Sequence, residues 1–293
     1  MTQALLDVVS RYADAHADME GVARTPIAGI TLIRASRPSA LQYAISKPLV
    51  ALVVQGQKRV TMGSDVFDFG AGDSLVITAD VPTISQVTSA SVGKPHYSLV
   101  LDLDQALLTD LSVEMKLAPV ADATLIRIEP TDAEVADAAQ RLLHLLDRPA
   151  SIPVLSAQLL REMHYWLLAG RHGSAIRRLG WPDGNIQRVA KAVALLRSDY
   201  AKQLPVEKLA GVAGMSVSSF HQHFRQVTSL SPLQFQKQLR LIEARRRMVS
   251  DGASASTAAY DVGYESVPQF TREYRRMFGI PPVRDVSAAR LSA

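Results

Sequence analysis

The sequence of 293 residues contains no cysteine, and this absence excludes several kinds of protein. Disulfide bonds, zinc sites built from cysteine and sensing by thiol oxidation all require that residue. Long apolar runs are also absent, since none approaches the ~18 residues of a membrane-spanning helix. The first twenty residues lack the basic start and long apolar core of a secretory signal. We therefore expect a cytoplasmic protein that has no membrane partner.

Motifs for metal binding and catalysis are scarce as well. Residues 29–103 contain one histidine, His96, and so lack the clustered ligands of a metal-binding cupin. His221 and His223 lie two positions apart on different faces of a predicted helix and cannot hold one ion together. Residues 72–75 spell GDSL, the first block of a hydrolase family, but the Asp-x-x-His of those enzymes is absent. We predict no metal, no cofactor and no enzymatic activity.

Charge is divided unevenly along the chain. Residues 185–293 contain 16 Lys and Arg against 8 Asp and Glu, a net charge of +8. Residues 1–184 contain 16 against 20, a net charge of −4. A basic segment beside an acidic one indicates that only the C-terminal part meets a polyanion. Solvated surface without such a partner is the alternative.

The N-terminal part changes from helical to β-rich spacing. Residues 1–20 place apolar side chains at helical intervals, whereas residues 29–103 consist of short β-rich runs broken by Gly, Pro and Asp. Short strands with regular turn signals are typical of a β-sandwich or barrel. Gly63-Ser64 predicts a two-residue hairpin turn between two of these runs.

Helical spacing returns in the second half of the chain. Two amphipathic helices are predicted at about 131–147 and 152–170, and they can pack on the β-rich part or on a second subunit. We place a first domain at 1–175, a linker at 176–185 and an all-helical domain at 186–293.

The helical domain contains an internal repeat with an offset of fifty residues. Each copy has a short helix, a glycine (Gly214 or Gly263), and a serine (Ser216 or Ser266) that begins a second helix. These are the features of a helix-turn-helix unit. The repeated positions are Phe220 and Phe270, Phe224 and Tyr274, Arg225 and Arg275, Pro232 and Pro282.

The two units, at about 206–228 and 255–278, are joined by a predicted helix over 232–250. At about 1.5 Å per residue this connector is roughly 27 Å long. Neighbouring major-groove faces on one side of B-DNA are about 34 Å apart. A stiff connector of that scale can hold two recognition helices in adjacent grooves. Its arginines Arg245–Arg247 can bind phosphate, or they can pair with Glu243.

Residues 186–286 resemble the DNA-binding domain of the AraC/XylS family of transcription regulators. The matching phrases are VEKLAGVAGMSVSSFHQHFRQVTSLSPLQF and AAYDVGYESVPQFTREYRRMFGIPP. Residues 46–104, with LVALVVQGQKRV and FGAGDSLVITADV, resemble the cupin-like N-terminal domain of one subgroup. The phrase REMHYWLLAGRHG fits that subgroup too, except that Trp166 stands where an arginine is expected.

The resemblance implies an α+β protein with a cupin-like β-barrel or sandwich, a helical appendage, and an all-α domain carrying both helix-turn-helix units. It implies a sequence-specific transcription regulator, an activator that binds double-stranded DNA as a homodimer and contacts RNA polymerase. A small-molecule effector would bind the N-terminal domain, at residues that the sequence does not identify. Two alternatives stay open: a regulator whose β domain only mediates assembly, and a cupin-like enzyme.

The resemblance also assigns DNA-contacting side chains. The first recognition helix would offer Ser218, His221 and Gln222 to base edges, with Arg225 better placed for a phosphate. In the second helix Val267 and Pro268 have no side-chain donor or acceptor. That helix would read through the remaining polar side chains or clamp the backbone. Those side chains are Gln269, Thr271, Arg272 and Arg275.

Overall fold

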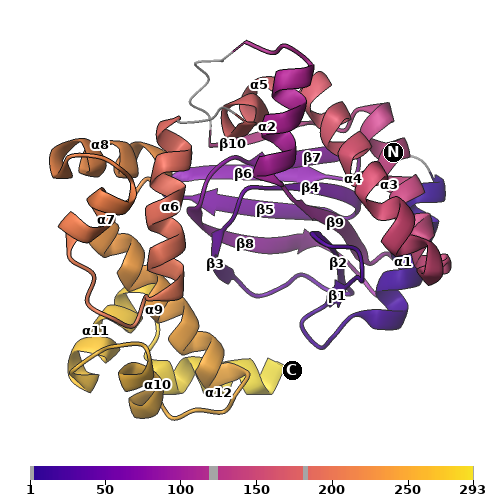
Figure 1. Ribbon diagram of the computed structural model, residues 1–293. Helices are drawn as coiled ribbons and strands as arrows, with labels where there is room; N and C mark the ends of the chain where they lie inside the picture. Colours follow the sequence, from indigo (N-terminus) through magenta and orange to yellow (C-terminus); the bar gives the residue numbers. More distant parts are fainter. Residues whose placement is uncertain (1–2, 119–124, 181–183, 293) are drawn as a thin grey trace. The chain divides into compact units, whose positions relative to one another are not determined.

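The computed structural model describes residues 3–118, 125–180 and 184–292, with only the backbone described from 288 onward. The chain forms two compact units, residues 1–187 and 188–293. The N-terminal unit contains strands and helices, and the described part of the C-terminal unit contains helices alone (Figure 1). Among the described residues, no helix has both the length and the apolar character needed to cross a bilayer.

Two antiparallel sheets form the centre of the N-terminal unit (Figure 1). The larger has the order β1 (Val22–Arg24), β2 (Ile30–Ala35), β9 (His96–Asp102), β4 (Leu49–Gln55), β7 (Asp73–Ile77) and β10 (Ile126–Pro130). The smaller has the order β3 (Gln42–Ser46), β8 (Val81–Ser89), β5 (Gln57–Met62) and β6 (Asp65–Gly70). Within the described part of the chain no strand pairing joins the two sheets. The sequence predicted either a barrel or a sandwich, and the described residues form a sandwich whose two sheets are not closed into a barrel.

Helices pack against the larger sheet and make one apolar core with it (Figure 1). Leu52 and Leu99 of the sheet are fully buried in this core, as are Leu5, Leu142 and Leu167 of the helices. Residues Val50–Val54 of β4 are all buried, because that strand is central and covered on both faces. The helices are α1 (Gln3–His16), α2 (Gln105–Glu114), α3 (Ala133–Leu143), α4 (Ile152–Ala169) and α5 (Gly173–Arg177).

The hairpin predicted at Gly63-Ser64 joins β5 to β6. Met62 pairs with Asp65, so the loop has two residues, and Gly63 has a φ of +60°. A left-handed φ at the first loop position matches the twist of the flanking strands and favours glycine. The strand prediction for this segment is therefore confirmed in both position and register.

The predicted linker at 176–185 is wrong over its first residues. Residues Gly173–Arg177 form α5 and a 3₁₀ turn follows to Gly180. Ile176 and Leu179 are fully buried in the core of the N-terminal unit. The Gly, Arg and Pro content of this segment suggested an exposed connection, but two apolar side chains were enough to fold it onto the core. Residues 181–183 lie outside the described residues, and the other domain limits stay predictions.

The C-terminal unit is helical throughout its described residues. Its helices are α6 (Asn185–Ser198), α7 (Val206–Val212), α8 (Val217–Thr228), α9 (Pro232–Val249), α10 (Ala255–Asp261), α11 (Val267–Phe278) and α12 (Pro282–Ser292). The central α9 begins with a capping box, in which the Ser231 side chain and the Gln234 side chain each bond the other's backbone N–H. It contacts α8, α10, α11 and α12.

Candidate nucleic-acid interface

The first helix-turn-helix consists of α7, a tight turn and α8. Gly214 ends α7 with a φ of +62°, a left-handed conformation that glycine adopts without strain. The Arg188 guanidinium donates to the carbonyl oxygens of Ala213, at 3.0 Å, and Gly214, which holds the turn against α6. The Ser216 hydroxyl accepts from the Ser219 backbone N–H and caps α8.

One face of α8 is apolar and fully buried. The rings of Phe220 and Phe224 lie 5.3 Å apart between centroids, and Phe224 meets Phe235 of α9 edge-on at 5.5 Å. This aromatic packing fixes the rotation of α8, so its other face must point to solvent. The helix is thereby presented with a defined polar side.

The polar side of α8 carries all four predicted contacts. Ser218, His221, Gln222 and Arg225 are exposed and follow the spacing i, i+3, i+4, i+7, which makes one stripe along the helix. None of their side chains forms a hydrogen bond or ion pair with another residue of the described ranges. The stripe is therefore available to an external partner.

The second helix-turn-helix, α10 and α11, repeats this frame with different internal chemistry. Gly263 has a φ of +86° and Ser266 caps α11. Phe270 and Tyr274 are buried like their counterparts in α8. The Tyr274 hydroxyl donates to Asp285 Oδ2 at 2.6 Å, and Arg245 donates to both oxygens of that carboxylate.

Burial alone would raise the pKa of Asp285, but the hydrogen bonds from Arg245 and Tyr274 outweigh it, and the pKa is lowered. Burial also raises the pKa of the Tyr274 hydroxyl, and its hydrogen bond to Asp285 adds to the rise. The second unit therefore has an ion pair and a tyrosine hydroxyl at the place where the first unit has two phenylalanine rings that meet edge-on.

The exposed side of α11 is cationic. Arg272 and Arg275 are exposed, and so is Arg276, which the sequence analysis missed although it lies one turn beyond Arg272. None of these three guanidinium groups has an acidic partner among the described residues. Thr271 is only half-buried. Arginines without partners on one helix face suit contact with phosphates.

Gln269 differs from the other predicted contacts, because its side chain is already engaged. Its amide donates to Glu273 Oε1 at 3.3 Å. The same carboxylate accepts from Lys237 Nζ at 2.9 Å and from the Tyr264 hydroxyl at 2.7 Å. Burial would raise the pKa of Glu273, but these donors lower it overall, which keeps the carboxylate ionised.

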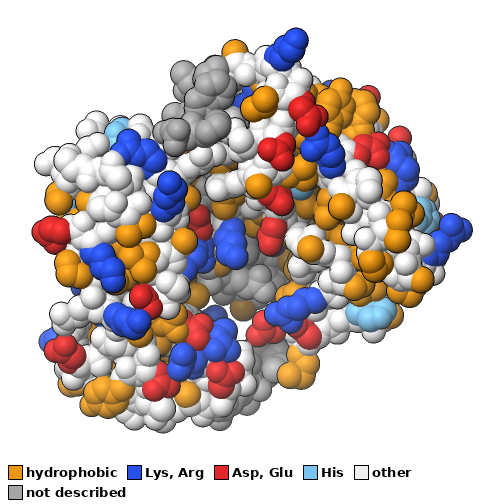
Figure 2. All heavy atoms as spheres, viewed as in Figure 1, with side chains coloured by type: hydrophobic (Ala, Val, Ile, Leu, Met, Phe, Trp, Pro, Cys, Tyr) orange, Lys and Arg blue, Asp and Glu red, His pale blue; other side chains and the backbone are white. Residues whose placement is uncertain are grey.

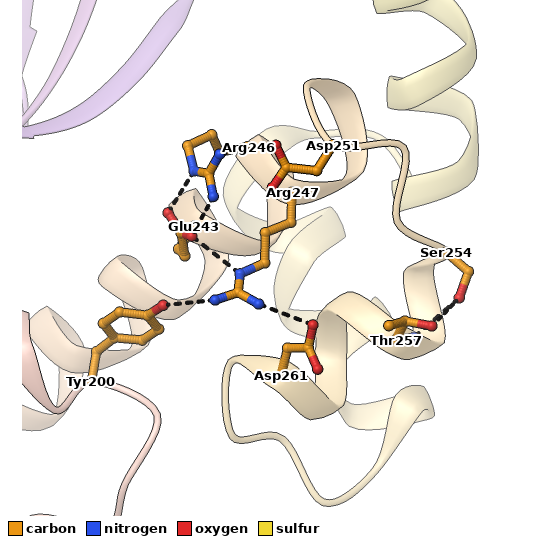
Figure 3. A network of polar contacts seen from close by, with 8 residues as sticks. All are labelled: Tyr200, Glu243, Arg246, Arg247, Asp251, Ser254, Thr257 and Asp261. Atoms are coloured by element: carbon orange, nitrogen blue, oxygen red, sulfur yellow. Dashed lines mark hydrogen bonds and ion pairs between the residues drawn. The ribbon is translucent and has the colours of Figure 1, made fainter.

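The arginines of α9 are paired rather than free. Figure 3 shows Arg246 and Arg247 on the carboxylate of Glu243, with Nη2 of Arg246 at 2.8 Å and Nε of Arg247 at 3.1 Å. Arg247 also donates to Asp261 of α10 at 2.9 Å and to the Tyr200 hydroxyl at 3.4 Å. The hydrogen bond from Arg246 is the largest cause of the lowered pKa of Glu243.

Arg246 and Arg247 thus pair with Glu243 as one of the alternatives predicted, whereas Arg245 pairs with Asp285 instead. Much of the positive charge of α9 therefore ties helices together. On the face shown in Figure 2, Lys and Arg side chains near α10 lie among Asp and Glu side chains. The cations that remain free for a polyanion include those of the two recognition helices.

The serine of the GDSL phrase lies in the interior of the N-terminal unit. Ser74 is 1% exposed and its hydroxyl lies 2.7 Å from Nε2 of His172, which is 2% exposed. The other ring nitrogen, Nδ1, is buried without a hydrogen-bond partner in the described structure. The pair ties β7 to the segment after α4. Among the described residues there is also no group of three His, Cys, Asp or Glu suited to a metal ion.

The fold and the two capped helix pairs define a DNA-binding protein that joins a β-sandwich unit to a double helix-turn-helix unit. A family model described as the AraC-type transcriptional regulator N-terminus matches residues 26–175. A second model, described as a helix-turn-helix domain, matches residues 209–285. The chain belongs to the family of AraC-type transcriptional regulators.

Curated relatives are similar over part of their length. The virulence regulon transcriptional activator VirF of Yersinia enterocolitica is 27% identical over 163 residues, 54% of this chain and 56% of VirF. The transcriptional activator RhaS of Enterobacter sp. is 29% identical over 108 residues, 37% of this chain and 38% of RhaS. The matches therefore span about half of VirF and less of RhaS.

A solved structure shares the fold of most of the chain. The crystal structure of ToxT from Vibrio cholerae with bound unsaturated fatty acid has a TM-score of 0.57 and covers 88% of this chain and 93% of ToxT. The identity is 9%. At that identity the likeness concerns the fold, which agrees with the predicted two-part α+β architecture.

Proposed function

We propose that this chain regulates transcription by binding double-stranded DNA with unequal use of its two recognition helices. The observation that carries the proposal is the contrast between their exposed faces. The stripe on α8 is mainly neutral and able to donate and accept, which suits base edges. The stripe on α11 is dominated by arginines without partners, which suits phosphates.

Gln269 supports this division of roles. A glutamine reads adenine through both its donor and its acceptor, but this amide is held by Glu273. We therefore assign base reading in α11 to Thr271 and Arg272 at most, and backbone contact to Arg275 and Arg276. On α8 we assign base reading to Ser218, His221 and Gln222, and a phosphate to Arg225.

The test uses DNA selected by the full-length protein from a random library, with affinity measured by anisotropy at several salt concentrations. Gln222→Ala should lose about 1–3 kcal/mol of binding free energy and relax preference at one base pair. Arg276→Ala should weaken all sequences similarly and reduce the slope of log K against log salt by about 0.9.

Arg284→Ala is the matched control, because Arg284 is exposed on α12 and outside both recognition helices. It should leave affinity and slope unchanged. Unaltered affinity and selectivity in Gln222→Ala would contradict base reading by α8. A base-specific loss in Arg276→Ala would contradict the assignment of that arginine to the backbone.

We further propose that a small molecule bound by the N-terminal unit controls this activity. The fold relative ToxT has a structure with a bound fatty acid, and the N-terminal unit here has a cleft of its own, described below. That cleft favours sensing over a β domain that serves assembly alone. An enzymatic role has less support, since the relatives VirF and RhaS are named as transcriptional activators and Ser74 is buried.

We propose that the chain forms a homodimer through α4. We also propose that this dimer acts in the cytoplasm, where its DNA target lies. Val154, Leu155 and Tyr165 are exposed on that helix, at 66%, 45% and 38%. Because the relatives VirF and RhaS are named as transcriptional activators, we also propose that this chain activates transcription through contact with RNA polymerase. Light scattering should give a dimer for the wild type and a monomer for Val154→Glu with Leu155→Glu. A dimer in both would reject α4 as the interface.

A further inference from the structure

One end of the sandwich holds a cleft of about 950 Å³. It lies where three connections meet, from β4 to β5, from β6 to β7 and from β8 toward β9. All the residues that line it belong to the N-terminal unit. Pockets that hold small molecules have volumes of about 300–1,000 Å³. The lining residues are Val54–Arg59, Asp68–Ala71, Asp73, Thr88–Ser91 and Lys94.

Lys58 enters this cleft from the inner face of the smaller sheet. It pairs with Phe69 of β6 and with Val87 of β8, and both of these side chains are 4% exposed. Residues paired directly across strands share a face, so Lys58 points with them into the space between the sheets. Its neighbour Arg59 takes the opposite face and forms a two-point ion pair with Asp68, at 2.7 and 2.8 Å.

The ammonium group of Lys58 has no hydrogen bond or ion pair to any residue in the described part of the chain. Burial lowers the pKa of this lysine. Lys58 is half-buried, so its amine is partly withdrawn from water with no acidic partner among the described residues, and a ligand that supplies a negative charge is favoured beside it.

His96 lies close to Lys58 and adds a second polar atom. Its side chain is fully buried, and Nε2 lies 3.1 Å from the Ser98 hydroxyl. Nδ1 is buried and has no hydrogen-bond partner within the described residues. Burial, together with the charge of Lys58, lowers the pKa of His96 to about 4. A neutral imidazole can donate from Nδ1 when Nε2 accepts from Ser98.

Gly56 brings the histidine to the cleft. Its φ is +84°, and a Cβ at this position would lie 2.6 Å from the Ser89 carbonyl oxygen and 3.0 Å from the Cα of His96. The three backbone segments therefore approach more closely than a side chain would allow. The tight corner packs the backbone at Ser89 and His96 against Gly56, two residues before Lys58.

We propose that the cleft binds a small hydroxylated carboxylate, whose carboxylate group pairs with Lys58. This inference rests on the proposed sensing function and names its ligand class. A carboxylate fits Lys58 because this amine lies between the sheets with no acidic partner among the described residues, whereas Lys94, the other unpaired cation of the lining, is exposed at the rim. A polar body fits better than an alkyl chain, because Gln57, Thr88, Ser89 and Ser91 line the cleft.

Such a ligand changes the protonation of its own site. A carboxylate beside Lys58 favours the charged amine and raises the pKa that burial has lowered. Binding should therefore take up protons wherever the pH lies between the lowered pKa of the free lysine and its pKa with the ligand bound, so it is measured over a series of pH values. Titration calorimetry in two buffers of different ionisation enthalpy measures that uptake, and a purely structural role of Lys58 would not produce it.

The probes are gluconate and glucuronate, with glucose as the neutral counterpart, decanoate as the apolar carboxylate and glucose 6-phosphate as the phosphate. We expect a hydroxylated carboxylate to bind the full-length protein with proton uptake. Lys58→Met should weaken that binding by roughly tenfold to a hundredfold, the loss typical of a charge-assisted hydrogen bond. Lys58→Arg should keep part of it. Lys47→Met is the control, since Lys47 is exposed and outside the lining.

Three outcomes would overturn the inference: no binding of either hydroxylated carboxylate at millimolar concentration, equal binding by Lys58→Met, or tighter binding of glucose, decanoate or glucose 6-phosphate. Thermal unfolding of Lys58→Met shows whether the variant is folded, and Lys58→Arg repeats the test if it is not. Binding to selected DNA is measured in parallel without ligand. Intact DNA binding with failed carboxylate binding rejects this inference alone, whereas a wild type that ignores DNA rejects the proposed function.

Discussion

The glycines at the two helix-turn-helix turns should differ sharply in their tolerance of alanine. Gly214 and Gly263 occupy equivalent places and both have positive φ, +62° and +86°. The left-handed conformation alone costs a non-glycine residue about 1–2 kcal/mol. Their surroundings differ, however. A Cβ at position 214 would meet a guanidinium nitrogen of Arg188 at 3.5 Å, whereas a Cβ at position 263 would overlap the carbonyl oxygen of Ala201.

The carbonyl of Ala201 cannot move freely, because Arg240 bonds it and also bonds the carbonyl of Gly263, at 3.1 and 2.9 Å. Displacing it disturbs both hydrogen bonds. We therefore expect Gly214→Ala to destabilise the C-terminal unit by about 1–2 kcal/mol. Gly263→Ala adds an overpacking term of about 1–3 kcal/mol and should cost about 2–5 kcal/mol in total.

Hydrogen exchange detected by mass spectrometry measures both changes within the full-length protein, from peptides of α7–α8 and of α10–α11. Gly211→Ala is the control, because Gly211 lies in α7 with no heavy atom near a new Cβ. It should stabilise the unit by about 0.5–1 kcal/mol. Equal losses from the two turn variants would refute the reasoning, since backbone conformation alone would then explain both.

Further predictions concern pH and the polar ties. Burial lowers the pKa of His96 and of His172 to about 4, so the unfolded chain binds more protons than the folded one between that value and about 6.5. The free energy of unfolding of the N-terminal unit should be highest above pH 6.5 and should fall toward pH 4, by up to about 3 kcal/mol per histidine. In His172→Gln the urea midpoint should therefore change less with pH across that range than in the wild type. Tyr274→Phe should lower the free energy of unfolding by about 1.5–3 kcal/mol, because it removes a hydrogen bond to the ionised Asp285; no change in the urea midpoint would contradict that. Arg247→Met should speed hydrogen exchange in α10 yet leave the salt dependence of DNA binding unchanged, whereas a slope smaller by about 0.9 would identify a phosphate contact.

Short-range signals predicted most of the helical unit. A serine that caps a helix, a glycine that ends one, and aromatic rings one turn apart act within a few residues. The positions of α8 and α11 therefore followed from the sequence. The segment after α4 did not, because its burial depends on Ile176 and Leu179 meeting a core made of distant strands and helices.

The cleft could not be predicted for the same reason. Successive side chains of β5 point to opposite faces of the sheet, and the sequence does not say which face is the inner one. Lys58 points inward because it pairs with Phe69 and Val87 of two other strands. From the sequence alone, His96 is the single histidine of the β-rich region and can either line an effector cavity or pack in the core. Its unpaired Nδ1 and its closeness to Lys58 are properties of two sheets packed together, which no local pattern contains.

The repeat shows how the two recognition units diverged without losing their shared frame. The offset of fifty residues places Tyr274 where the first unit has Phe224, and Asp285 where it has Phe235. Two rings that meet edge-on in one unit thus correspond to a hydroxyl–carboxylate hydrogen bond in the other, and the carboxylate pairs with Arg245. On the exposed side, the same offset makes Arg272 of the second unit the equivalent of Gln222 in the first. The exposed face of α11 is cationic where that of α8 is mainly neutral, and this contrast is the ground for our proposal that the second unit clamps the backbone while α8 reads the bases.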